Sequence, residues 1–314
     1  MAKFKIQHIT RYTYEVPVRD SANQIMLYPI TDEHQEITLH AISVTGNPDV
    51  DIHRDIFGNK VGTFTHSHPH RELVIDSRLE VITKSKKLPE DALPIEAQWQ
   101  ALEKVKDQIP FIDFLRLEPF QALPEVEKLM DEVRCKNCSP LVSAQEFCTY
   151  VFTNFTYKKG ITTVETTLDE IWKIRSGVCQ DFAHFLLAIL RLFNIPARYV
   201  SGYICPNKNG MRGEGATHAW VEAYIPDYGW LGLDPTNNCI ANENHVRLAV
   251  GKNFSDCSPV RGTYRGTSNH TLEVAVTVSY ENGQLSAGVQ EDALPVSSIS
   301  RNSFRKHQEM QMQQ

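Results

Sequence analysis

The first eighty or so residues alternate apolar and polar side chains with the period of two that is typical of β-strands. Phe4 and Ile6 alternate with polar neighbours, and the same alternation returns around Leu73. Between two such stretches, Gly58 and Asn59 indicate a hairpin turn, because both residue types tolerate positive φ. We therefore predict an all-β, sandwich-like domain for this part of the chain.

The pattern changes to helical spacing in the middle of the chain. Two Ser/Thr-x-x-Glu sequences predict helix starts, one from Ser143 and one from Thr167. A third, longer helix begins near Cys179 and ends before Pro196. Its predicted buried face is formed by apolar residues at helical spacing: Phe182, Phe185, Leu186, Ile189, Leu190 and Phe193.

Strand patterns return after this helix, at residues 197–204, 216–225 and 229–234, and again at 272–278, which we expect to close the same domain. The fold class is therefore α+β, with the long helix packed on an antiparallel sheet. Between the first two strands, a polar, glycine-rich stretch at 207–215 predicts a mobile surface loop. The predicted organisation has four parts: an N-terminal β domain (1–85), a proline-rich packed connector with short helical segments (86–124), an α+β domain (125–280) and a polar, disordered tail (281–314).

Net charge, apolar stretches and cysteine content indicate which kinds of molecule and which compartment suit this chain. The 314-residue chain carries a formal net charge of -6, so we expect no nucleic-acid partner and a protein or peptide substrate or another small molecule. It shows no signal-peptide core and no apolar stretch long enough to span a bilayer, which favours the cytoplasm and no membrane partner. Seven cysteines scattered over a chain of this size favour reduced thiols.

Cys179 is the candidate nucleophile. At a helix start, unpaired N–H groups and the helix dipole stabilise a thiolate. Gly177 lets the chain turn tightly and brings backbone donors near an acyl oxygen bound at the sulfur, as in an oxyanion hole. The alternative is that Cys179 is a small buried hydrophobic residue, as most cysteines are. A base nearby decides between the two.

His218 and Asp234 are the candidate partners of the thiol. His218 lies on the less apolar face of the strand at 216–225, and a hairpin about Asp227 and Tyr228 brings Asp234 opposite roughly Val221, within reach of the imidazole. The sulfur would attack an acyl carbon, the imidazole would move the proton, and the carboxylate would fix the tautomer of the imidazole. The alternative is a strand histidine satisfied by a neighbour and an Asp-Pro turn.

Metal sites are not expected. His66, His68 and His70 would place three imidazoles on one strand face, but Pro69 argues against a regular strand and no carboxylate or cysteine shares the spacing. Cys135 and Cys138 lack a second cysteine pair, so we interpret them as two ordinary thiols near a helix end. The chain contains no EF-hand pattern. We predict no metal and no cofactor.

Three further residues near Cys179 have roles to consider. Tyr157 could donate a hydrogen bond to an oxyanion, although a structural bond is the preferred interpretation. Asp181 suits the positive end of the helix. His184 could compete as the base, but it falls too far round the helix and lacks an obvious carboxylate partner.

Three segments, in this order along the chain, resemble the core motifs of the transglutaminase-like superfamily. They are residues 177–184, 217–222 and 234–236. The N-terminal stretch, with its turn at residues 55–59, resembles the β domain that precedes this core in a bacterial branch of the family. Residues 261–266 resemble the segment that follows the Asp motif in that branch. The resemblance covers nearly all of the chain except the tail.

The resemblance implies a papain-like α+β core with Cys179 as nucleophile, His218 as base and acid, and Asp234 as orienting carboxylate. Members include glutamine-crosslinking transglutaminases, peptidases and amidases that share a thioester intermediate, and bacterial members with this architecture are usually described only as candidate cysteine proteases. We therefore expect a cysteine peptidase or amidase. The alternatives are transfer of a glutamine acyl group to an amine, and a binding module that has lost the chemistry. The oligomeric state is left open.

Overall fold

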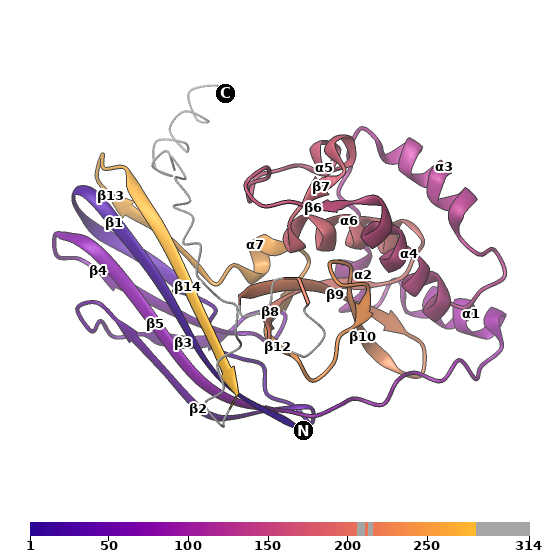
Figure 1. Ribbon diagram of the computed structural model, residues 1–314, viewed down its shortest axis with the longest axis horizontal. Coiled ribbons are helices and arrows are strands. Elements are labelled where there is room, and N and C mark those ends of the chain that lie inside the picture. Colours follow the sequence, from indigo (N-terminus) through magenta and orange to yellow (C-terminus); the bar gives the residue numbers. More distant parts are fainter. Residues whose placement is uncertain (206–210, 213–215, 281–314) are drawn as a thin grey trace.

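The computed structural model describes residues 1–205, 211–212 and 216–280, and Figure 1 shows a sheet-rich part beside a part that carries most of the helices. The tail expected at 281–314 lies outside the described residues. So does the loop expected at 207–215, apart from Met211 and Arg212. None of the described helices is long and apolar enough to cross a membrane.

A long strand, β1 (Ala2–Ile25), organises the sheet-rich part. Its first half pairs with β5 and β14, and its second half pairs with β4 and β13. The register shifts between Thr13 and Val18 where the two halves meet, so one strand serves two sets of partners around one apolar core. The other strands of this sheet are β2 (Gln35–Val44), β3 (Asp51–Arg54), β4 (Lys60–His66), β5 (His70–Thr83), β13 (Val260–Arg265) and β14 (His270–Tyr280).

The position of β14 corrects one prediction. We expected the strand at 272–278 to close the α+β domain, but Figure 1 shows it alongside β1. The two strands pair along their length, with Phe4 opposite Tyr280. Val276 and Val278 of β14 are buried in the core of this first sheet. Alternation predicts a strand and its buried face, but it does not say which sheet the strand joins.

The helices that follow β5 in the chain differ from the prediction, because they are longer than expected or begin at an earlier residue. In the connector, α1 (Ile95–Val105) is a full helix, with α2 (Phe111–Leu115) and α3 (Leu123–Val133) after it. Ser139 caps α4 (Pro140–Asn154) by accepting a hydrogen bond from Val142 N at 3.3 Å, so the predicted start at Ser143 was wrong.

The predicted capping box at the next helix is confirmed. Thr167 and Glu170 open α5 (Leu168–Ile174) with both bonds of the box present. These bonds satisfy two of the amide groups that a helix start leaves without partners.

The second part has the predicted α+β architecture. Its long helix packs against β9 through Ala219, Val221 and Ala223, and among the described residues five strands form one antiparallel sheet in the order β11-β10-β9-β8-β12. Its elements are β6 (Thr156–Tyr157), β7 (Ser176–Gly177), α6 (Cys179–Leu192), β8 (Ala197–Ile204), β9 (Thr217–Ile225), β10 (Gly229–Asp234), β11 (Cys239–Ile240), β12 (His245–Gly251) and α7 (Phe254–Cys257).

The opposite face of this five-stranded sheet packs on the N-terminal part. Tyr203 and Val246 belong to the same apolar core as the residues of β1. The predicted turn after β3 has Gly58 at φ +84°, and it delivers Asn59 into the interface. The buried Asn59 side chain donates to Val250 O at 2.7 Å and accepts from Val250 N at 2.9 Å. The two parts therefore share buried polar as well as apolar contacts.

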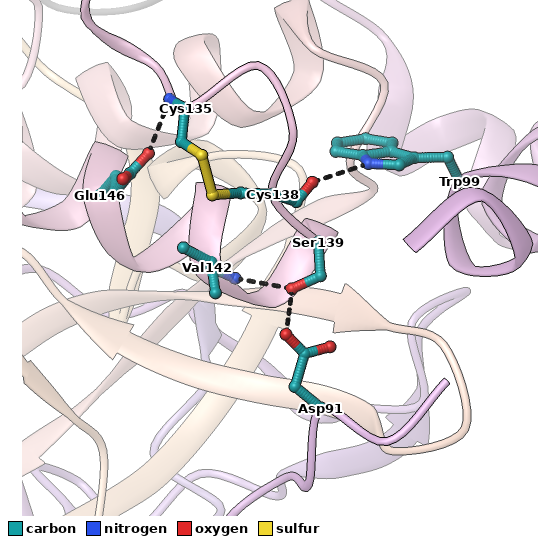
Figure 2. Close-up of a disulfide and its surroundings, with 7 residues drawn as sticks. All are labelled: Asp91, Trp99, Cys135, Cys138, Ser139, Val142 and Glu146. Atoms are coloured by element: carbon teal, nitrogen blue, oxygen red, sulfur yellow. Dashed lines mark hydrogen bonds between the residues drawn. A yellow bond between two sulfur atoms is a disulfide. The ribbon is translucent and has the colours of Figure 1, made fainter. Parts of the chain in front are cut away.

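Cys135 and Cys138 form a disulfide, which corrects the expectation of two reduced thiols (Figure 2). The turn between α3 and α4 places their Cα atoms 5.5 Å apart, within the range that a disulfide spans. Cys135 N donates to Glu146, and Cys138 O accepts from the indole of Trp99, both at 3.0 Å. The other cysteines are free thiols: Cys148, Cys179, Cys205, Cys239 and Cys257.

Candidate active site

Cys179 is the first residue of α6, as predicted, and its side chain is partly exposed. The backbone N–H of Val178, the residue before it, donates to Asp181 at 2.7 Å, and Thr162 Oγ1 donates to the same carboxylate oxygen at 2.7 Å. A Cβ on Gly177 would lie 2.3 Å from that oxygen, so glycine is required for this close approach. Because amides in a first helical turn have no acceptor within the helix, the start of α6 places backbone N–H groups close to the thiol.

His218 and Asp234 meet at the end of the β9–β10 hairpin. Leu233 pairs with Val221, so Asp234 lies one residue beyond the predicted register. This shift of one residue decides on which face of the sheet the Asp234 side chain lies, because directly opposed residues of an antiparallel pair point to the same side of the sheet. Asp234 therefore shares the face of His218, and its Oδ2 accepts from His218 Nε2 at 2.8 Å with both side chains fully buried.

The buried pair holds opposite charges. Burial alone lowers the pKa of His218, but the charge and hydrogen bond of Asp234, together with the neighbouring Cys179, raise that pKa to about 10. For Asp234, burial favours the neutral form, but His218 and His245 hold the pKa of the carboxyl well below its usual range. His218 Nδ1 has no hydrogen-bond partner among the described residues, so this nitrogen is available to a group that approaches the site.

Three further residues hold the carboxylate of Asp234, and the sequence analysis missed two of them, Asn237 and His245. Asn237 donates to Oδ2 through its side chain at 2.7 Å and to Oδ1 through its backbone at 3.3 Å. His245 Nε2 lies 3.2 Å from Oδ2, and Thr236 N donates to Oδ1 at 2.9 Å. An Asx turn after Asp234 could have indicated Asn237. No local pattern indicates His245, which reaches the site from another strand.

Tyr157 lies beside the start of α6 because β6 pairs with β7, where Tyr157 is opposite Gly177. Burial and the neighbouring Cys179 raise the pKa of Tyr157 to about 12, so its hydroxyl keeps its proton at neutral pH. A donor role toward an oxyanion is compatible with this position and stays a prediction.

His184 is occupied elsewhere. Its Nε2 accepts from Phe254 N at 3.1 Å, and burial, together with the charge of Arg191, lowers the pKa of His184 to about 4. The imidazole is therefore neutral and committed to a structural bond. His218 is the better candidate for the base.

Two clusters in the described part of the chain contain three possible metal ligands. One is Cys135, Cys138 and Glu146, in which the sulfur atoms are joined to each other. The other is His218, Asp234 and His245, in which each imidazole nitrogen is directed at Oδ2 at hydrogen-bond distance. We assign a metal to neither cluster.

The histidines at 66, 68 and 70 do not share a strand. His66 ends β4 and His70 begins β5, with their rings 4.3 Å apart across the turn that contains His68. The chain reverses between them, so the single strand face that would have presented three imidazoles does not form.

Comparison with known proteins supports this architecture. Residues 127–235 match the family model of the transglutaminase-like superfamily, and residues 4–82 match that of the bacterial transglutaminase-like N-terminal region. An uncharacterised protein of Mycobacterium tuberculosis (strain H37Rv) is 31% identical over 294 residues, which cover 88% of this chain and 92% of the relative. The chain belongs to the transglutaminase-like superfamily. The core match includes Cys179, His218 and Asp234 of this transglutaminase-like protein.

Two other relatives are informative. A protein-glutamine gamma-glutamyltransferase of Pseudomonas aeruginosa is 35% identical over 127 residues, which cover 38% of this chain and 19% of the relative. A crystal structure from Cytophaga hutchinsonii, described as a "Putative Cysteine Protease", superposes with a TM-score of 0.71 at 22% identity and covers 94% of this chain and 95% of its own. That similarity confirms that the transglutaminase-like protein shares its fold over both parts.

Proposed function

We propose that this transglutaminase-like protein is a thiol enzyme that cleaves peptide or amide bonds through a thioester on Cys179, with His218 and Asp234 completing a triad. The observation that carries the proposal is the buried His218–Asp234 pair, in which Asp234, with a smaller contribution from the neighbouring Cys179, raises the pKa of His218 to about 10. An imidazolium held beside a thiol favours the thiolate, which is the nucleophilic form.

The chemistry follows from the position of each group. The Cys179 sulfur attacks the carbonyl carbon, and the backbone N–H groups of the first turn of α6 stabilise the charge that develops on the carbonyl oxygen. His218 gives its proton to the departing amine nitrogen as the carbon–nitrogen bond breaks, which leaves a thioester. His218 then takes a proton from water as the water oxygen attacks, and it returns that proton to the sulfur as the acid leaves.

A second candidate is transfer of the acyl group to a primary amine. It is supported by the 35% identity to the Pseudomonas aeruginosa protein-glutamine gamma-glutamyltransferase over 127 residues. The steps up to the thioester are the same, and only the nucleophile that resolves the thioester differs. A binding module without chemistry is less well supported, because it would have no need for a charged, fully buried His218–Asp234 pair.

The test is a screen of a peptide library, read by mass spectrometry, with and without a fluorescent primary amine. We expect new carboxyl termini or deamidated glutamines, lost in Cys179→Ala and kept in Cys239→Ala, which removes another partly exposed free thiol. Products that carry the amine would favour acyl transfer over hydrolysis. Equal products from Cys179→Ala and wild type would refute the proposal.

A further inference from the structure

A second imidazole binds the same carboxylate oxygen as His218. His245 is the first residue of β12, which is separated from β9 by β8 in the sheet. Its Nε2 lies 3.2 Å from Asp234 Oδ2, with 1% of the His245 side chain and none of the Asp234 side chain exposed. Because this contact is shielded from water, a hydrogen bond here is stronger than one at the surface and affects the charge and orientation of the carboxylate.

The surroundings of His245 identify its tautomer. Asn242 N lies 3.2 Å from His245 Nδ1, so this nitrogen accepts a hydrogen bond. The side-chain oxygen of Asn242 already accepts from Asn244 N at 2.9 Å and lies farther from Nδ1, at 3.4 Å. Nε2 therefore carries the proton and donates it to Asp234. His245 is a neutral donor, whereas His218 is the charged partner of the same oxygen.

The two imidazoles are linked through the carboxylate. The ring of Trp220 lies 5.2 Å from that of His245 and 6.2 Å from that of His218, whereas the two imidazole rings are 6.2 Å apart. Oδ2 of Asp234 accepts from His218, His245 and the side chain of Asn237. Each donor comes from a different element, so together they fix where Oδ2 points.

We infer that His245 is a positioning residue of the triad, which aims the ionised carboxylate of Asp234 at His218 by donating a hydrogen bond to Oδ2. This inference rests on the proposed function of the same site. His245 does not touch a substrate and moves no proton. The Nε2–H group of the neutral His245 ring stabilises the negative charge of the Asp234 carboxylate and restrains the rotation of that carboxylate. Without it, Oδ2 keeps two of its three donors and the bond to His218 loses its fixed direction.

The experiment compares His245→Leu, which removes the donor, with His245→Gln, whose amide can still donate to Oδ2. The first readout is the rate at which iodoacetamide alkylates Cys179 at pH 7, resolved by mass spectrometry. The second is the proton NMR signal of His218 Nε2–H. Because a hydrogen bond to a charged group contributes about 1.5 to 3 kcal/mol, we expect His245→Leu to slow alkylation, by at most about ten- to hundredfold, and to shift or broaden the signal. We expect His245→Gln to restore both.

A purely structural role predicts a different outcome, in which His245→Leu and His245→Gln lower the melting temperature alike and leave alkylation of Cys179 unchanged. That result would overturn the inference. If His245→Leu does not fold, nitrogen chemical shifts of the wild-type histidines decide: a proton on His245 Nδ1 instead of Nε2 would also overturn it. Neither readout needs turnover. If the peptide screen fails but His245→Leu and His245→Gln still differ in alkylation of Cys179 and in the NMR signal, the proposed function is rejected and the positioning role of His245 is retained.

Discussion

Replacing Asp234 with asparagine tests how far the charge of His218 depends on the carboxylate. The rise in the pKa of His218 from 6.5 to about 10 corresponds to about 5 kcal/mol in favour of the imidazolium, and Asp234 is the main source of the rise. Asparagine has no charge. Its NH₂ group would face His218, His245 and Asn237 in one orientation and the backbone N–H of Thr236 in the other. We expect burial to dominate in the variant and to take the pKa of His218 below 6.5.

The assay is an NMR titration of protein labelled at histidine, with the His218 signal assigned by its absence in His218→Gln. In the wild type, His218 should keep its proton through pH 9, whereas in Asp234→Asn it should be neutral at pH 7.5. Asp227→Asn is the matched control, because Asp227 is exposed in the turn of the same hairpin at φ 61°, a conformation that asparagine tolerates. A folded Asp234→Asn protein whose His218 still titrates near pH 10 would refute the reasoning.

Three further outcomes follow from the structure. A thiol assay on unfolded, unreduced protein should find five thiols, and seven after reduction, because Cys135 and Cys138 are joined; seven without reductant would contradict the disulfide. Burial lowers the pKa of His8 and of His184 to about 4, so between pH 6.5 and 4 the unfolded chain binds protons that the folded chain does not. The free energy of unfolding, measured with urea, should therefore fall between pH 6.5 and pH 4, by up to about 3 kcal/mol for each of these two histidines; equal values at pH 6.5 and 4.5 would count against it. Thr167→Ala removes both bonds that the Thr167 side chain makes in the capping box and should lower the free energy of unfolding by about 1 kcal/mol, which a urea titration can resolve.

The features that could be predicted from the sequence are those that short-range patterns control. Alternation identified the strands that became β1 and β5, and the Thr167 capping box marked the start of α5. The start of α6 at Cys179 follows from a turn residue and an apolar helical face, both within a few positions of it. His218 and Asp234 could be paired because a short hairpin limits how far apart they can lie.

The features that could not be predicted depend on contacts between distant segments. Nothing local in the last strand says that it will pair with β1, and His245 reaches Asp234 from a strand that is not adjacent to β10 in the sheet. The register of the hairpin was predicted one residue short, which would have placed Asp234 on the wrong face. Ser139 was missed as the cap of α4, although Pro140 at the first helical position is a known signal for it.

The most direct test of the account is the rate at which iodoacetamide alkylates Cys179 at pH 6, resolved by mass spectrometry, in wild type and in His218→Ala. Cys239 is the internal control, because it is also partly exposed, and burial together with Asp234 raises its pKa to about 12. The account predicts that Cys179 reacts much faster than Cys239 in the wild type and loses that advantage in His218→Ala. A Cys179 that reacts as slowly as Cys239 in both proteins would contradict the thiolate–imidazolium pair and the enzyme proposed from it.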